Sequence, residues 1–147
     1  YDLKPEMSAY ELTDEIVNAM NSDNYQSIII NYANPDMVGH TGNLDAAIKA
    51  IEAVDICLGK LIKYSSKLKY TIFLTADHGN LEMMVDQNSK SIHTAHTTLP
   101  VPLYMFSDKD YSLLKNGKLA DIAPTILDYL KIEKPSDMTG KSLLIKK

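Results

Sequence analysis

Two short apolar runs flank a long stretch with helical periodicity, and this order is the strongest constraint on the fold. Residues 26–31 and 70–75 are rich in β-branched and other apolar side chains, which is typical of strands buried on both faces of a parallel sheet. Between them, apolar residues recur at helical spacing over residues 43–64, which predicts a long helix. A strand, a helix and a second strand in succession predict an α/β fold with a mostly parallel sheet.

The chain is long and apolar enough for one domain. Its 147 residues are 45% hydrophobic and 23% charged, which suits a single globular domain over residues 1–147 with a sizeable core. The spacing from Ser8 to Glu11 is that of a capping box, and an apolar stripe follows it. Residues 9–20 are therefore predicted to form a helix.

Two further elements are predicted near the C-terminus. Residues 101–106 are apolar but contain Pro102, which cannot donate a backbone hydrogen bond, so they are predicted to form an edge strand or the start of a strand. Residues 119–131 are predicted to form a last helix, which tolerates Pro124 because that residue lies near the first turn.

Charge and cysteine content exclude several functions. The net charge is −4 and all 15 basic residues are lysines, so neither nucleic acid nor a membrane is an expected partner. The chain also lacks the guanidinium fork that usually binds phosphate. With one cysteine, Cys57, no signal peptide and no run long enough to span a bilayer, a cytoplasmic location is expected. The start without methionine, in sequence that already looks structured, suggests a fragment.

Aspartate and histidine occur together directly after both apolar runs. Asp36 and His40 follow the first run, Asp77 and His78 follow the second, and the two remaining histidines, His93 and His96, lie in a third patch. In an α/β fold the functional site lies beyond the carboxyl ends of the strands. Carboxylate oxygens and imidazole nitrogens suit Mn²⁺, Zn²⁺, Fe²⁺ or Co²⁺, so these residues predict a metal site.

A simpler interpretation remains possible for each motif. Asp36 and His40 could cap backbone groups in a tight turn, and Asp77 and His78 could belong to a polar turn beside Gly79. The second aspartate–histidine pair after a second strand favours the metal site. Of the two histidines in the third patch, one is expected to be a ligand and the other to support it or to be exposed.

The motifs together resemble a known family. Residues 31–42, 75–80 and 93–97, followed by the proline-rich residues 100–102, are similar to the C-terminal part of cofactor-independent (2,3-bisphosphoglycerate-independent) phosphoglycerate mutases. The resemblance extends over the flanking strings, residues 1–11, 119–125 and 138–143, and so covers essentially the whole chain.

The resemblance implies a fold and a set of ligands. The expected fold is an alkaline-phosphatase-like sandwich with a mostly parallel sheet, which is incomplete because the N-terminal part is missing. Two Mn²⁺ ions are expected in the intact enzyme, although other divalent ions stay possible. Asp36, His40 and His96 resemble the ligands of one ion, and Asp77 and His78 resemble part of the second site. His96 is therefore preferred over the other histidine of its patch.

The resemblance also implies that parts needed for the reaction are absent. In this family a serine takes the phosphoryl group from one position of phosphoglycerate and returns it to the other, which interconverts 3- and 2-phosphoglycerate in glycolysis and gluconeogenesis. That serine and an aspartate of the second metal site belong to a missing N-terminal segment, and arginine-rich substrate contacts belong to a separate phosphotransferase domain. No serine here lies in the family's nucleophile context, so this chain alone is predicted to have no catalytic residue and no activity.

Two other functions stay open on the sequence. The chain could be a free-standing metal-binding module without turnover, or part of another phosphohydrolase of the alkaline phosphatase superfamily. An upstream segment with the serine, followed by a transferase domain, would favour the mutase. If a neighbouring strand is missing, the sheet should expose unpaired edges, and residues 86–99 are expected to be mobile without metal.

Overall fold

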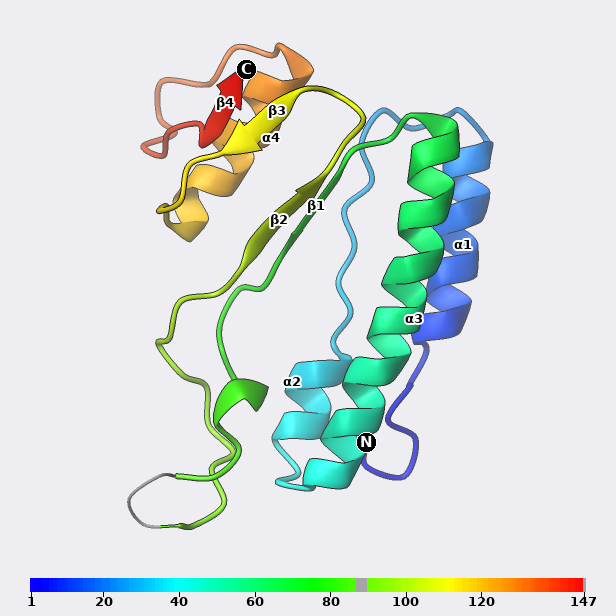
Figure 1. Ribbon diagram of the computed structural model, residues 1–147, viewed down its shortest axis with the longest axis vertical. Helices are drawn as coiled ribbons and strands as arrows, with labels where there is room; N and C mark the ends of the chain where they lie inside the picture. Colours follow the sequence, from blue (N-terminus) through cyan, green and yellow to red (C-terminus); the bar gives the residue numbers. More distant parts are fainter. Residues whose placement is uncertain (87–89, 147) are drawn as a thin grey trace.

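The computed structural model describes residues 1–86 and 90–146 (Figure 1). In Figure 1, α1 and α3 lie side by side, β1 and β2 form a ribbon beside them, and the C-terminal elements gather at one end of this ribbon. The elements in chain order are α1 (Ala9–Asn21), α2 (Asn34–Gly39), α3 (Leu44–Leu68), β1 (Ile72–Thr75), the short 3-10 helix η1 (Leu81–Met83), β2 (Leu103–Phe106), β3 (Tyr111–Leu113), the 3-10 helix η2 (Leu119–Asp121), α4 (Ile122–Leu130) and β4 (Leu144–Lys146).

The two helices predicted in the first half of the chain are confirmed as α1 and α3. The α3 helix begins after Asn43, whose side chain accepts a hydrogen bond from the backbone N–H of Ala46, and this is the usual role of an N-cap. It continues about one turn beyond the predicted end, to Leu68, and stops at Lys69 in the left-handed conformation, with φ 61°. Buried apolar side chains join α1 to α3: Ile16, Val17, Met20 and Leu61.

The predicted mostly parallel sheet is not confirmed, because both strand pairs in the described residues are antiparallel. β1 pairs antiparallel with β2, in a register that runs from Ile72 opposite Phe106 to Thr75 opposite Leu103. β3 and β4 form a second antiparallel pair. Among the described residues between β1 and β2, η1 is the only helical element and there is no long crossover helix, and β2 runs opposite to β1. The strand predicted over residues 101–106 is confirmed in a shorter form that begins after Pro102.

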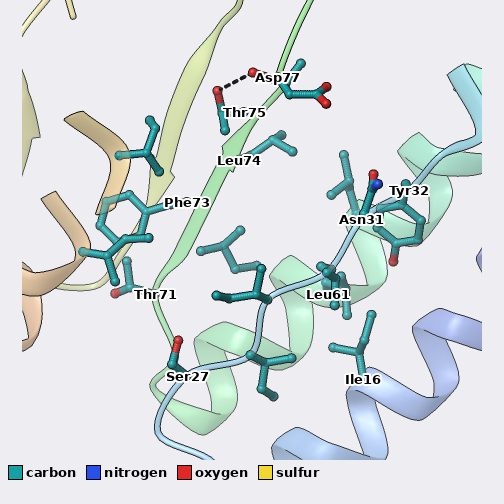
Figure 2. A pocket seen from close by; sticks show the side chains of 18 of the residues that line it. Ile16, Ser27, Asn31, Tyr32, Leu61, Thr71, Phe73, Leu74, Thr75 and Asp77 are labelled. Carbon is teal, nitrogen blue, oxygen red and sulfur yellow. Dashed lines mark hydrogen bonds between the residues drawn. The ribbon is translucent and has the colours of Figure 1, made fainter. Parts of the chain in front are cut away.

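The strand predicted over residues 26–31 does not form. This segment is extended and runs in the same direction as β1 (Figure 2). The two segments do not touch as paired strands, because they line a cavity of about 1610 Å³. No backbone hydrogen bond joins residues 26–31 to any other part of the described chain. The apolar pattern was therefore interpreted correctly as extended, and the strand is missing because no neighbouring backbone lies within hydrogen-bonding reach.

The motif after this segment is helical, although a turn or loop was expected there. α2 begins at buried Asn34, whose side-chain amide donates to the carbonyl oxygens of Pro5 and Glu6. Pro35 follows at the first turn, where its missing N–H needs no partner. α2 packs on the start of α3 through a second apolar cluster, made of Val38, Ala46, Ala47, Ala50 and Met84.

The predicted C-terminal helix appears as two pieces, η2 and α4. Pro124 is the third residue of α4, within the turn that needs no intrahelical donors. Buried Asp121 holds this region together, because its carboxylate accepts from the backbone N–H groups of Lys118 and Lys141. The short strands β3 and β4 were not predicted.

Among the described residues, no helix is long and apolar enough to cross a membrane. The segment expected to be mobile without metal, residues 86–99, includes residues 87–89, which lie outside the described part of the chain. That expectation stays a prediction.

Candidate metal centre

Three side chains that can bind a metal converge at the end of α2. Asp36 and His40 lie four residues apart on α2 and its C-cap, and His96 comes from the irregular chain before β2. The Oδ1 atom of Asp36 lies 3.3 Å from His40 Nε2 and 3.0 Å from His96 Nε2. The two Nε2 atoms are 3.1 Å apart. Within residues 1–86 and 90–146, this is the only group of three or more His, Cys, Asp or Glu side chains whose ligand atoms converge in this way.

The orientation of His40 leaves one nitrogen available for a metal. Its Nδ1 atom lies 2.7 Å from the carbonyl oxygen of Thr94. Since a carbonyl oxygen can only accept, Nδ1 carries the ring proton and donates it. In the neutral ring Nε2 then keeps its lone pair, and this lone pair faces Asp36 and His96. A backbone carbonyl that holds the far nitrogen of an imidazole is a common support for metal-binding histidines.

The spacing of the three ligand atoms fits a shared divalent ion. Two ligand atoms bound at about 2.1 Å are separated by about 3.0 Å at a right angle and about 3.4 Å at a tetrahedral angle. The distances among Asp36, His40 and His96 lie between 3.0 and 3.3 Å. One carboxylate with two imidazoles suits borderline divalent ions such as Mn²⁺, Fe²⁺, Co²⁺ or Zn²⁺. The residues therefore fit a metal ion in both geometry and chemistry.

Asn80 positions the carboxylate of this group. It is buried, and its side-chain amide donates to Asp36 Oδ1 at 2.7 Å. Burial raises the pKa of Asp36, but the Asn80 hydrogen bond and the nearby histidines lower it by more, so the pKa lies below its ordinary value. The carboxylate is thus held in the charged form that a cation requires.

Gly39 makes room for this contact. A Cβ atom at Gly39 would lie 2.5 Å from Asn80 Oδ1, closer than any side chain tolerates. The backbone N–H of Asn80 donates to Glu82 Oε2 at 2.7 Å, and the other oxygen of Glu82 accepts from the hydroxyl of Thr97. The turn that carries Asn80 is therefore tied to the segment that carries His96.

The sequence analysis assigned no role to Asn80, Glu82 or Thr97. Asn80 directly follows Asp77, His78 and Gly79 in the sequence. A polar residue next to predicted metal ligands was the one signal that could have indicated its role. Glu82 and Thr97 are 15 residues apart, so nothing in their spacing indicated the contact.

Asp77 and His78 lie beside this group but are not part of it. The His78 ring stacks on the His96 ring with centroids 3.7 Å apart and planes at 19°. His78 Nδ1 donates to the Gly79 carbonyl oxygen at 3.3 Å, while its Nε2 lies 3.6 Å from Asp77 Oδ1. The Asp77 side chain is 84% exposed. The second pair therefore provides two neighbouring ligand atoms and supports a ring of the first group.

His93 lies outside the three-residue group. It is partly buried, its backbone N–H donates to the Met84 carbonyl oxygen, and its Nδ1 atom has no hydrogen-bond partner in the described structure.

Comparison with known proteins places the chain in a family. The family described as "Metalloenzyme superfamily" matches residues 1–134. The chain belongs to the metalloenzyme superfamily, and the convergent ligands agree with divalent metal binding in that family.

Its relatives include curated proteins named 2,3-bisphosphoglycerate-independent phosphoglycerate mutase. The protein from Clostridium perfringens is 57% identical over 148 residues, which cover 99% of this chain and 29% of the relative. A second relative, phosphoglycerate mutase 2 from Methanosarcina barkeri, is 53% identical over 99% of this chain and 28% of its own length. The chain thus spans less than a third of the curated relatives that it matches.

A solved structure has the same fold as this chain. Phosphoglycerate mutase from Leishmania mexicana, studied at low cobalt concentration, superimposes with a TM-score of 0.90 and is 31% identical. The match covers 100% of this chain and 30% of that chain. The architecture is therefore an alkaline-phosphatase-like α/β metalloenzyme fold, and the predicted resemblance to the C-terminal part of these mutases is confirmed.

Proposed function

We propose that this chain is the C-terminal, metal-binding part of a cofactor-independent phosphoglycerate mutase, which interconverts 3- and 2-phosphoglycerate through a phosphoserine. The strongest support is the convergence of Asp36, His40 and His96 in a chain that matches a protein of that name over 99% of its length. The nucleophilic serine and the phosphotransferase domain belong to the remaining length of the protein, where most of the relatives' sequence lies.

In this proposal Asp36, His40 and His96 hold one divalent ion, for which Mn²⁺ is the expected occupant. When bound, such ions offset phosphoryl charge and lower the pKa of a hydroxyl nucleophile. This chain's own residues contribute positioning: Thr94 orients His40, and Asn80 fixes Asp36.

Asp77 and His78 supply part of a second ion site in the same proposal. They contribute two neighbouring atoms, one oxygen and one nitrogen, at the carboxyl end of β1. Two protein ligands bind a metal less firmly than three, so further ligands from the rest of the protein are needed. The 147 residues are accordingly proposed to form one part of a larger phosphatase domain, whose sheet becomes mostly parallel when complete.

An enolase-coupled assay tests the proposal. The chain alone in Mn²⁺ is expected to show no mutase turnover, because a phosphoenzyme needs a positioned nucleophile. A fusion is expected to be active when it joins residues 1–147 to the N-terminal part of the Clostridium perfringens mutase, replacing the region that this chain matches. The Cys57→Ala fusion is the control and should keep its turnover, because this buried cysteine lies in the helical core.

The result also separates the alternatives. Turnover by the isolated chain would contradict the need for the remaining length. A folded but inactive fusion would favour a metal-binding module, and phosphate release without mutase activity would favour another phosphohydrolase.

A further inference from the structure

His96 reaches the metal centre on a segment without regular secondary structure. Residues 93–98 form neither a helix nor a continuous strand. Backbone hydrogen bonds attach this segment to the chain after β1: the N–H of His93 donates to the Met84 carbonyl oxygen and the N–H of Thr97 donates to that of Gly79, each at 2.9 Å. Because His96 itself is exposed, its place depends on these attachments rather than on burial.

The His96 ring also lacks the support that orients His40. The Nδ1 atom of His40 is held by the Thr94 carbonyl oxygen, whereas Nδ1 of His96 has no hydrogen-bond partner among the described residues. A metal-binding histidine usually donates its far N–H to a group that fixes the ring. The orientation of His96 must therefore come from contacts of the segment that carries it.

The side chain of Glu82 ties that segment to the turn after β1. One carboxylate oxygen accepts from the Thr97 hydroxyl, and the other accepts from the backbone N–H of Asn80 at 2.7 Å. The hydrogen bond from Thr97 lowers the pKa of Glu82 below its ordinary value, against the opposing effect of burial, so the carboxylate is charged at neutral pH. Hydrogen bonds to a charged acceptor are stronger than those between neutral groups.

Gly79 shows that the chain is shaped for this contact. A Cβ atom at Gly79 would overlap both the Thr97 hydroxyl and the Glu82 carboxylate. The φ angle of Gly79 is not positive, so the backbone conformation does not require a glycine there. The space that the missing side chain leaves is filled by the hydrogen bond between Glu82 and Thr97.

The same attachment brings two histidines together. Gly79 and Thr97 oppose each other in an antiparallel bridge, which makes His78 and His96 diagonal neighbours, within reach of each other's rings. The rings stack with centroids 3.7 Å apart, while His96 Nε2 lies 3.0 Å from the Asp36 carboxylate. The stack therefore fixes the plane of the His96 ring in place of a hydrogen bond to its Nδ1.

We propose that Glu82 is a positioning residue for the metal centre, because its hydrogen bond to Thr97 keeps the His96 ring on His78 and at Asp36. The inference deepens the proposed function and rests on it for the ion that Asp36, His40 and His96 hold. Loss of this hydrogen bond leaves all three ligands in the chain but frees the His96 ring to turn, so ion binding weakens.

Titration of the 147-residue chain with Mn²⁺, followed by calorimetry, tests the proposal. Thr97→Val removes the hydroxyl at nearly constant size and should weaken binding by about tenfold, the lower end of the loss when a group that orients a ligand is removed. Thr97→Ser retains the hydroxyl and should retain the affinity. Thr98→Val, at an exposed neighbouring position, is the control and should bind as the parent does. Parent-like affinity in Thr97→Val would overturn the proposal.

A double variant shows whether Glu82 acts through Thr97. Glu82→Ala should also weaken Mn²⁺ binding, and adding Thr97→Val to it should cause no further loss, because both changes break the same hydrogen bond. Losses that add would mean that the two residues act separately and would overturn the assigned role.

The histidine rings provide a measurement that needs no metal. In NMR spectra of the metal-free chain, the ring protons of His78 and His96 should lose their stacking shift in Thr97→Val and keep it in Thr97→Ser. Unchanged amide signals of α3 show that the fold is intact; if Thr97→Val disturbs them, Glu82→Ala gives the same test from the other partner. Rings that stay stacked in both variants would overturn the proposal, even where the affinity falls.

These measurements and the mutase assay fail independently. An active fusion, with unchanged ion affinity and unchanged ring shifts in Thr97→Val, would refute the role of Glu82 and keep the proposed function. An inactive fusion, with weakened binding and altered ring shifts in that variant, would support the role of Glu82 and refute the function.

Discussion

The two aspartate–histidine sites differ in how much of each is built within this chain. Around Asp36, three ligand atoms lie within 3.3 Å of one another, and Asn80 and Thr94 hold their orientation. Around Asp77, His78 is the one ion-pair partner found among the described residues, and the carboxylate is mostly exposed. The chain around Thr94 returns to the first site at α2 and brings His96 to it, whereas Asp77 and His78 belong to no group of three ligands among the described residues.

The largest expected effect separates the two sites directly. In the isolated chain, His96→Ala should weaken Mn²⁺ or Zn²⁺ binding by more than about 100-fold, since losing a group that only orients a ligand already costs 10- to 100-fold. The matched variant Asp77→Ala should change the affinity by less than about threefold, because only one further ligand lies beside it. Isothermal titration calorimetry measures both. Equal losses would show that the ion lies between the two sites.

The number of bound ions sharpens the same comparison. The isolated chain should bind one ion firmly, and the fusion with the N-terminal part of the Clostridium perfringens mutase should bind two, because the added part completes the site at Asp77 and His78. Equilibrium dialysis with metal analysis gives the ratio. Two firmly bound ions in the isolated chain would contradict the view that the second site is incomplete.

Asn80 should have an intermediate effect that is confined to the first site. Asn80→Ala removes the donor that fixes Asp36 and should weaken metal binding by roughly 10-fold. Asn18→Ala, at an exposed position on α1, is the control and should leave the affinity unchanged. Calorimetry again provides the measurement, and an unchanged affinity in Asn80→Ala would remove it from the positioning residues.

Asp121 should have the smallest effect on metal binding and a clear effect on stability. Hydrogen bonds from the backbone N–H groups of Lys141 and Lys118 hold its pKa below the ordinary value, against the opposing effect of burial. A lowered pKa in the folded state stabilises the protein above the ordinary pKa, near 4, and this contribution disappears as the pH falls through the folded-state value.

The corresponding variant is Asp121→Asn, which should unfold several degrees below the parent at pH 7 and differ less at pH 3. Thermal unfolding followed by circular dichroism at both pH values measures this. A difference that grows toward pH 3 would mean that the carboxylate is not the group responsible, and a loss of metal affinity would show that the two ends of the molecule are coupled.

The sequence predicted most of the local structure, because local structure depends on near neighbours along the chain. The apolar repeat and the capping residue Asn43 specify α3 within a few residues. The proline at the start of the C-terminal helix was placed correctly for the same reason. The sequence also placed Asp36 and His40 near each other, but it expected a turn or loop there, and the helical spacing that brings them to one face appears only in the structure.

What only the tertiary structure decided depends on residues far apart in the chain. Residues 26–31 have the composition of a buried strand, yet they stay unpaired, because a strand needs a neighbour and composition cannot supply one. Likewise, His96 meets Asp36, which lies 60 positions earlier in the chain, only because the chain around Thr94 returns to α2. Asn80 contacts Asp36 through the same long-range folding. The sequence by itself determined which residues can bind a metal, and the long-range contacts decided which of them meet.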